Sequence, residues 1–366
     1  MIVLDSVGCG NAPDAAAYGD EGADTLGHLF DGFSELSLPN LDSLGLAGLI
    51  GRGFSGELRQ GAGAFRLSEQ SAGKDTTTGH WELMGCAIKE PFFTCESFPD
   101  EFVTELSIAG GTGFIGNKVA SGTEILKELG EEHISSGKPI LYTSADSVLQ
   151  IAAHEEVFGL DRLLNLCRTA RRLLDERNLK VGRVIARPFI GTASTGFQRT
   201  GNRHDYSLTP DGTVLDLLVG KGIKVIGVGK ISDIFAGKGI SVSYPTKDNA
   251  GGMAEIDRQW SLRQEGNSFI FANLVDFDSL YGHRRDPYGY ARCLMEFDAW
   301  LGGFLAKVHA GDLVMLTADH GNDPYHRGTD HTREQVPCLI VSGGNACSGE
   351  MKVFSDVGRC VEAFFD

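Results

Sequence analysis

Short uninterrupted runs of apolar residues recur along the chain, and segments with a helical period lie between them. The apolar runs cover residues 2–5, 139–145, 182–190, 224–229, 268–277, 312–319 and 337–343. Runs of this length are typical of strands that are buried on both faces of a parallel sheet. Helices are predicted at 161–177 and 288–306, where apolar residues recur every three to four positions. The alternation predicts an α/β fold with a mostly parallel central sheet flanked by helices.

Composition narrows the class of protein. The 366 residues are enough for two domains. No stretch approaches the roughly 18 uncharged apolar residues of a membrane span, so we expect no membrane partner. The formal net charge of −16 argues against nucleic acid as the main partner. The first residues lack a basic segment followed by a long apolar one, so we expect a cytoplasmic protein without a secretory signal.

The charge is unevenly distributed. The segment from Arg162 to Arg203 contains ten basic and two acidic residues, a local net charge of +8. The rest of the chain therefore carries −24. Arg168, Arg171 and Arg172 lie on the predicted helix 161–177 and can be explained as a solvated face. Arg183 lies within an apolar run, where solvation is a poorer explanation.

Three of the apolar runs end in aspartate, at Asp5, at Asp276 with Asp278, and at Asp319. Ligands of parallel α/β sheets bind at the carboxyl ends of the strands, so these carboxylates are expected to converge. A single terminal aspartate could be an ordinary helix N-cap. Three of them, with histidines beside two, favour a metal site.

The histidines refine this hypothesis. His320 follows Asp319 directly, His331 follows eleven residues later, and His283 follows Asp278 by five. Carboxylate and imidazole ligands suit Mn²⁺, Zn²⁺, Fe²⁺ or Mg²⁺. Three aspartates and three histidines are too many for one four-coordinate ion with an open position, whereas two ions fit. Two adjacent ions usually flank a displacement at phosphorus.

A nucleophile for such a displacement is expected in residues 71–82. Gly73-Lys74 superficially suggests a phosphate-binding P-loop, but Ser68 and Asp75 break that pattern. Three hydroxyls remain, those of Thr76, Thr77 and Thr78, at the start of a predicted helix whose N-terminus could receive an anion. An ordinary threonine cap explains them equally well, and the pattern alone does not choose among the three.

Several runs together resemble the phosphopentomutases of the alkaline phosphatase superfamily. They are residues 2–8 (IVLDSVG), 73–82 (GKDTTTGHWE), 142–147 (YTSADS), 275–278 (VDFD), 283–287 (HRRDP) and 317–323 (TADHGND). The resemblance implies an alkaline-phosphatase-like core, residues 1–92 and 211–366, with an inserted smaller α/β cap domain, residues 93–210. It also implies an isomerase that interconverts α-D-ribose 1-phosphate and D-ribose 5-phosphate, and the 2-deoxyribose phosphates, with a sugar bisphosphate such as glucose 1,6-bisphosphate as activator.

The same resemblance assigns roles to individual residues. One Mn²⁺ is expected on Asp5, Asp319 and His320, and a second on Asp278, His283 and His331. Thr76 is the expected nucleophile, active as phosphothreonine, which would resolve the choice among the threonines. The expected substrate contacts are Ser144, Asp146, Arg183, Ile185, Arg199 and Lys230. The oligomeric state stays open, a monomer included.

Two other functions have to be weighed. A hydrolase or another mutase on the same core, such as an alkaline phosphatase or a cofactor-independent phosphoglycerate mutase, would differ in the cap and around the nucleophile. The run Lys74 to Glu82 favours the pentomutase. A non-catalytic metal-binding protein could keep the scaffold, but all six expected ligands and the nucleophile are present.

Overall fold

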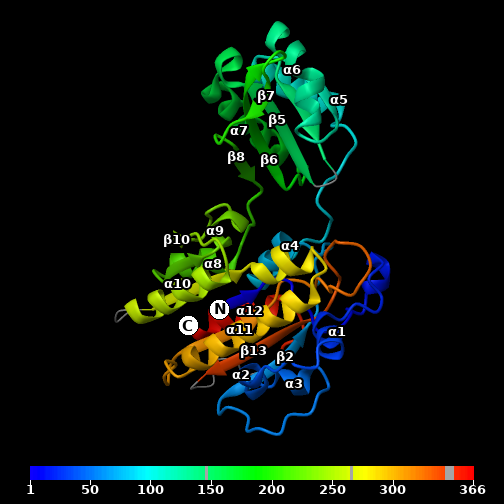
Figure 1. The fold of residues 1–366 in the computed structure, drawn as a ribbon. Helices are drawn as coiled ribbons and strands as arrows, with labels where there is room; N and C mark the ends of the chain where they lie inside the picture. The colour runs from blue at the N-terminus through cyan, green and yellow to red at the C-terminus, as the bar shows by residue number, and fades with distance from the viewer. Residues whose placement is uncertain (145–146, 264–266, 343–349) are drawn as a thin grey trace. The chain divides into compact units, whose positions relative to one another are not determined.

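The chain folds into two compact units. The computed structural model describes residues 1–144, 147–263, 267–342 and 350–366. The larger unit combines Met1–Glu90 with Pro210–Asp366, and the smaller unit is the intervening segment Pro91–Thr209 (Figure 1). Each unit has a sheet of its own. The smaller unit is therefore inserted into a discontinuous larger one.

The larger unit is built on a seven-stranded sheet in the order β10-β9-β11-β1-β12-β13-β2. The strands from β10 to β12 are parallel to one another, whereas β13 runs antiparallel to both of its neighbours. The strands are β1 (Ile2–Leu4), β2 (Ala62–Leu67), β9 (Lys224–Val228), β10 (Val242–Tyr244), β11 (Ser268–Leu274), β12 (Leu313–Thr317) and β13 (Val336–Ser342). The sheet is thus mostly parallel, with its antiparallel part at one edge.

Helices cover both faces of this sheet. On one face, α10 packs on β11 and β9, and α11 packs with α1 and α2; on the other, α4 contacts α9 and α12, and α12 contacts α8 (Figure 1). The helical elements are η1 (Ala15–Tyr18), α1 (Thr25–Gly32), α2 (Pro39–Ser43), α3 (Leu46–Leu49), α4 (Thr76–Leu83), α8 (Val214–Gly220), α9 (Ile231–Ile234), α10 (Asn249–Leu262), η3 (Phe277–Gly282), α11 (Pro287–Leu305) and α12 (Ser355–Phe364). Among the described residues, no helix is both long enough and apolar enough to cross a membrane.

The smaller unit has a six-stranded sheet, with β3-β4-β5-β6-β7 in order and β8 paired with β6. Alternate side chains point to opposite faces of a strand, so each face builds a separate core. On one face α5 and α7 cover Leu149, Ile151 and Val184, and on the other α6 covers Tyr142 and Phe189. Its elements are α5 (Asp100–Gly110), β3 (Ile115–Val119), α6 (Glu124–Ser136), β4 (Ile140–Thr143), β5 (Val148–His154), η2 (Glu155–Gly159), α7 (Leu160–Glu176), β6 (Arg183–Thr192), β7 (Gly196–Arg199) and β8 (His204–Ser207).

Most of the elements expected from periodicity are present. Each expected apolar run contains a strand, and the helices expected at 161–177 and 288–306 are α7 and α11. The pattern missed β2, β3, β5, β7, β8 and β10. Alanine and glycine, which have little preference for strands, occupy half of β2, and two adjacent alanines weaken the signal of β5.

Candidate metal centre

Three adjacent parallel strands deliver carboxylates to one end of the larger sheet. Asp5 follows β1 directly, Asp319 follows β12 by two residues, and Asp278 lies in the π-helical turn η3 after β11. β1 pairs with both other strands, in a register that aligns Leu4 with Leu274 and Val3 with Thr317. The exposed fractions are 2% for Asp5, 8% for Asp278 and 0% for Asp319. The expected convergence at the strand ends is confirmed.

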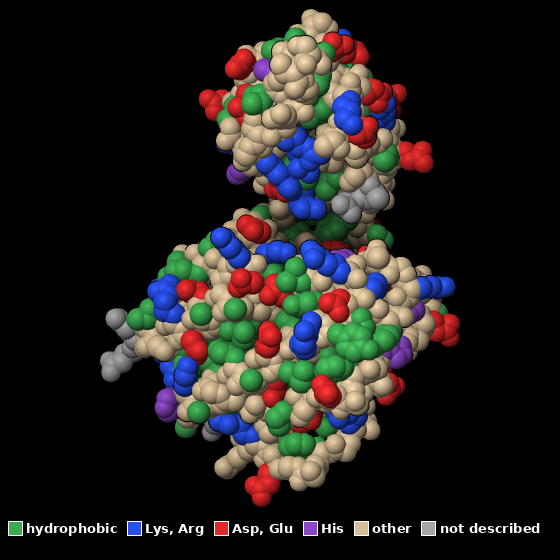
Figure 2. All heavy atoms as spheres, viewed as in Figure 1, with side chains coloured by type: hydrophobic (Ala, Val, Ile, Leu, Met, Phe, Trp, Pro, Cys, Tyr) green, Lys and Arg blue, Asp and Glu red, His purple; other side chains and the backbone are tan. Residues whose placement is uncertain are grey.

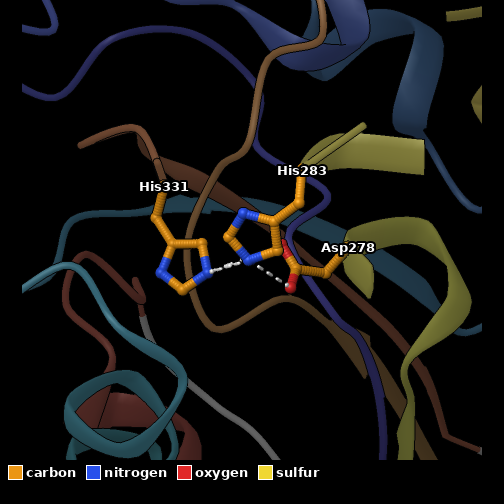
Figure 3. A group of neighbouring side chains, drawn as sticks. All are labelled: Asp278, His283 and His331. Atoms are coloured by element: carbon orange, nitrogen blue, oxygen red, sulfur yellow. Dashed lines mark hydrogen bonds and ion pairs between the residues drawn. The ribbon is translucent and has the colours of Figure 1, made fainter. Parts of the chain in front are cut away.

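One group of potential ligands consists of Asp278, His283 and His331 (Figure 3). His283 Nε2 lies 3.2 Å from Asp278 Oδ2 and 3.1 Å from His331 Nε2. His331 Nε2 lies 3.6 Å from Asp278 Oδ1. Two imidazole nitrogens and a carboxylate that point toward one another form a donor set suited to a divalent cation.

A second group consists of Asp5, Asp278 and His320, so that Asp278 belongs to both. His320 Nε2 lies 3.5 Å from Asp5 Oδ1 and 3.4 Å from Asp319 Oδ2. The rings of His320 and His331 stack with centroids 3.9 Å apart, which brings the two groups side by side. All six residues expected as ligands therefore lie in one cluster, with Asp278 between the two groups.

Two buried oxygens in this cluster suit a cation. Asp5 Oδ1 and Asp319 Oδ2 accept no hydrogen bond from any described residue, although both are buried. His80 Nδ1 lies 3.0 Å from Asp319 Oδ2, but it also lies 2.9 Å from the carbonyl oxygen of Thr76. A buried carboxylate oxygen without a partner is costly, and a metal ion would remove that cost. The donor set thus fits a divalent metal.

In the metal-free centre, burial, neighbouring charges and hydrogen bonds move the pKa values of the ligands in different directions. Burial raises the pKa of Asp5 well above its usual value, and the charges of Asp319 and Asp278 add to this effect. Burial opposes ionisation of Asp278 as well, but hydrogen bonds with His283 and His331 hold its pKa well below the usual value. The hydrogen bond to Asp278 raises the pKa of His283 to about 9. Burial therefore opposes ionisation of both carboxylates, and the one with two imidazole partners keeps a low pKa.

Thr76 is the first residue of α4, and its hydroxyl lies at the metal centre. Thr76 Oγ1 is 3.2 Å from His320 Nε2. Asp75 caps the helix by accepting hydrogen bonds from the backbone N–H groups of Thr77 and Thr78, and the Thr78 hydroxyl in turn bonds to Asp75. Gly79 lets the helix approach, because a Cβ there would lie 2.1 Å from the carbonyl oxygen of Asp319.

Two buried residues beside the ligands were not singled out from the sequence. His80, which is fully buried, and Asn273, on β11, join the carboxylates of two neighbouring strands. The Asn273 amide donates a hydrogen bond to Asp5 Oδ2 and lies 3.0 Å from His80 Nε2. His80 occurs in the run that carries Thr76, which is the only signal the sequence offers for it.

The residues expected to contact substrate are spread over both units. Ser144, Arg183, Ile185 and Arg199 lie in the smaller unit, Lys230 is exposed in the larger one, and Asp146 lies outside the described residues. The Arg183 side chain is partly exposed, with Nη1 3.8 Å from Asp205 Oδ2. Ile185 is 98% buried. Figure 2 shows Lys and Arg side chains gathered on one part of the smaller unit. The basic stretch from Arg162 to Arg203 falls entirely within this unit.

Comparison with known proteins shows which family the chain belongs to. Residues 1–363 match the metalloenzyme superfamily. The phosphopentomutase of Symbiobacterium thermophilum is 54% identical over 343 residues, which cover 93% of this chain and 86% of that protein. The phosphopentomutase of Syntrophotalea carbinolica is 50% identical and covers 100% of this chain and 94% of its own. The chain belongs to the phosphopentomutase family.

Membership in the phosphopentomutase family confirms three expectations from the sequence. The chain is a mutase of the isomerase class, it has the alkaline-phosphatase-like α/β core, and its family and donor groups indicate metal dependence. Among solved structures, a protein from Pyrococcus horikoshii covers 100% of this chain and 96% of its own, with a TM-score of 0.49 and 14% identity.

Proposed function

We propose that this enzyme interconverts α-D-ribose 1-phosphate and D-ribose 5-phosphate, and the corresponding 2-deoxyribose phosphates, through a phosphothreonine at position 76. The names of relatives at 50–54% identity support the reaction. The observation that carries the mechanism is the position of Thr76 Oγ1, 3.2 Å from His320 Nε2 at the first residue of a helix.

The proposed cofactor is a pair of Mn²⁺ ions, one held by Asp5, Asp319 and His320 and the other by Asp278, His283 and His331. Such ions, when bound, neutralise charge on the transferring phosphoryl group and lower the pKa of the attacking oxygen. The protein's part is to hold these side chains at the ends of three paired strands, with two buried carboxylate oxygens, Asp5 Oδ1 and Asp319 Oδ2, beside His320 Nε2.

Thr76 transfers the group in two balanced steps. The Thr76 Oγ1–phosphorus bond breaks while a sugar hydroxyl forms the new bond, which gives a pentose 1,5-bisphosphate. The proton lost by that hydroxyl replaces the phosphoryl group on Thr76. The other phosphate then returns to Thr76 by the reverse exchange and leaves the isomeric monophosphate. Thr76 is the first residue of α4, where the helix dipole favours the negative charge that passes through this position.

Residues beyond the metal centre are proposed to hold the sugar and its second phosphate. Arg183 and Arg199 offer planar guanidinium groups that bind phosphate through two parallel hydrogen bonds. Ser144, Asp146, Ile185 and Lys230 supply the remaining contacts. We further propose that a sugar bisphosphate, such as glucose 1,6-bisphosphate, activates the enzyme by phosphorylating Thr76.

The phosphothreonine is tested by intact-protein mass spectrometry before and after incubation with Mn²⁺ and glucose 1,6-bisphosphate. We expect one added phosphoryl group on the peptide that contains Thr76. Thr76→Val should abolish the label and lower kcat by roughly 10⁴-fold or more, as loss of a nucleophile does. Thr77→Val is the matched control and should keep both. Full activity of Thr76→Val would reject this nucleophile.

A coupled assay distinguishes the mutase from a hydrolase on the same core. With ribose 1-phosphate as substrate, ribose 5-phosphate should accumulate while inorganic phosphate stays near background. Release of inorganic phosphate at the rate of sugar turnover would show a phosphatase and reject the proposed reaction.

A further inference from the structure

Arg285 occupies the loop between η3 and α11, two residues after His283, and binds an unusual number of acceptors. Its Nε donates to the carbonyl oxygen of Gly328 at 2.5 Å, and its Nη2 donates to that of Asp330 at 3.0 Å. Its Nη1 lies within hydrogen-bonding distance of the Asn322 side-chain oxygen and of the Gly282 and Asp323 carbonyl oxygens. One guanidinium therefore joins five acceptors, of which four are backbone carbonyls.

Four of these acceptors belong to the segment that separates two proposed ligands. Residues 321–331 run from His320 to His331 and contain no helix or strand apart from an isolated bridge between Gly321 and Thr332. Such a segment has no ladder of hydrogen bonds of its own, so its shape depends on side chains that bind its carbonyls. Arg285 binds it near both ends, which fixes the segment against the loop that carries His283.

From this segment Arg285 reaches each ligand of one group through a single intermediary. The Asn322 amide accepts from Arg285 through its oxygen and donates to Asp278 Oδ1 at 2.8 Å through its nitrogen. His283 Nδ1 donates to the carbonyl oxygen of Thr329 at 2.7 Å, between two residues whose carbonyls Arg285 binds. Asp330 directly precedes His331. The Nε2 atoms of both histidines are thereby left to face each other and Asp278.

The backbone at Arg285 supports a functional role for this arrangement. Its φ of +53° lies in the left-handed region. A non-glycine residue is strained there, and such residues persist where the surroundings over-determine them. The hydrogen bonds of the guanidinium are the described interactions that offset this cost.

The ligands proposed for the other ion, Asp5, Asp319 and His320, are fixed differently. Asp5 and Asp319 lie at the ends of buried strands, where Asn273 donates to Asp5 and the Ser6 N–H donates to Asp319 at 3.1 Å. Neither contacts Arg285 in the described structure. The side chains of His283 and His331 are 39% and 15% exposed, against 1% for His320. The more exposed ligands, His283 and His331, are thus the ones whose positions depend on the hydrogen bonds of Arg285.

We propose that Arg285 is a positioning residue for the metal ion held by Asp278, His283 and His331, and that it sets the affinity of this ion selectively. The inference rests on the proposed two-metal centre. Residues that orient metal ligands from the next layer typically change metal affinity by 10–100-fold. Lysine at position 285 would keep the charge but lose the planar fork that serves five acceptors.

Mn²⁺ binding by the metal-free full-length chain tests the proposal. Equilibrium dialysis against Mn²⁺ alone, with elemental analysis, should give two equivalents for the wild type. Arg285→Lys should bind one equivalent with unchanged affinity and the other at least about tenfold more weakly. Arg327→Lys is the matched control: Arg327 lies in the same segment but donates one hydrogen bond, to the carbonyl oxygen of Gly19, and both equivalents should remain.

Asn322→Ala provides a second test, which keeps the Arg285 side chain and its four carbonyl acceptors but removes the amide that links it to Asp278. It should weaken the same equivalent. Unchanged binding in Arg285→Lys and Asn322→Ala would overturn the proposal, as would equal weakening of both equivalents, which a general loss of structure would produce. A wild type that binds fewer than two equivalents would instead reject the two-metal centre.

Discussion

His283 carries a proton in the metal-free protein that a bound cation has to displace. The hydrogen bond to Asp278 raises the pKa of His283 to about 9, and only the neutral imidazole binds metal. Mn²⁺ binding at pH 7.5 should therefore release at least about one proton, and the affinity should rise by up to about tenfold per pH unit until pH 9. Calorimetric titrations in two buffers of different protonation enthalpy measure the release.

The same shift has a consequence for the stability of the metal-free protein. A histidine whose folded pKa is raised contributes stability that is fully present below its unfolded pKa and is lost as the pH rises through the folded value. The contribution of His283 to stability should thus disappear between about pH 6.5 and 9.

The proton release measured on Mn²⁺ binding tests the assignment of His283 as a ligand. A release that is zero at pH 7.5, or equal at pH 7.5 and pH 10, would contradict this assignment.

Single residues also show where sequence reasoning reaches its limit. Asp5, Asp278 and Asp319 could be predicted because parallel strands end at a common edge. His80 and Asn273 could not, because their role depends on how closely α4 approaches β1 and β12. That approach requires Gly79, whose missing side chain is visible in the sequence but whose contact with Asp319 is not.

At the scale of one element, the first turn of α4 couples helix capping to the nucleophile. Asp75→Ala removes the acceptor for two backbone N–H groups and should cost about 1 kcal/mol of stability. Because Thr76 is the first helical residue, fraying of this turn should also slow its phosphorylation by glucose 1,6-bisphosphate. Chemical denaturation and time-resolved intact mass measure the two effects.

Helix α8 offers a matched control for this prediction. Thr213 caps α8 through the same reciprocal arrangement, with Asp216 in place of Thr78, and α8 carries none of the proposed ligands. Thr213→Ala should lose a similar amount of stability and keep the phosphorylation rate. Equal slowing in both variants would show that the effect is one of general stability.

The elements could be predicted where burial on both faces left a continuous apolar run, as in β1, β11 and β12. The strands at the two edges of this sheet, β10 and β2, lack such a run. β10 is only three residues long, and β2 is half alanine and glycine, so neither differs from a loop by hydrophobicity alone. Their assignment depends on partners that are distant in the sequence.

At the scale of the whole molecule, metal binding should stabilise only the larger unit. An ion that binds the folded state alone adds about 2.7 kcal/mol when its concentration is 100 times the Kd. All six proposed ligands lie in the larger unit, whereas the smaller one has two hydrophobic cores of its own. Calorimetry with and without a chelator should show one transition that moves to lower temperature and one that does not. A single transition that moves as a whole would contradict this independence.

The division of charge is another whole-molecule feature that could be read from the sequence. The stretch with a local charge of +8 falls inside the smaller unit, whose 13 basic and 15 acidic residues nearly balance, so most of the net negative charge lies in the larger unit. The position of the basic stretch in the fold could not be predicted. Arg183 and Arg187 lie on β6, which pairs with β5, and the hydrophobic pattern did not detect β5.

The central position of β1 also determines the order in which the protein can assemble during synthesis. β1 precedes the other described strands along the chain, and its two partners, β11 and β12, begin only at Ser268 and Leu313. At 5–20 residues per second a ribosome needs roughly 15–60 s to reach them. During that interval the smaller unit, a continuous segment, can complete its fold, while an apolar strand ending in Asp5 stays unpaired. Chaperone contacts on the nascent chain should therefore concentrate on the first residues and end when β12 emerges.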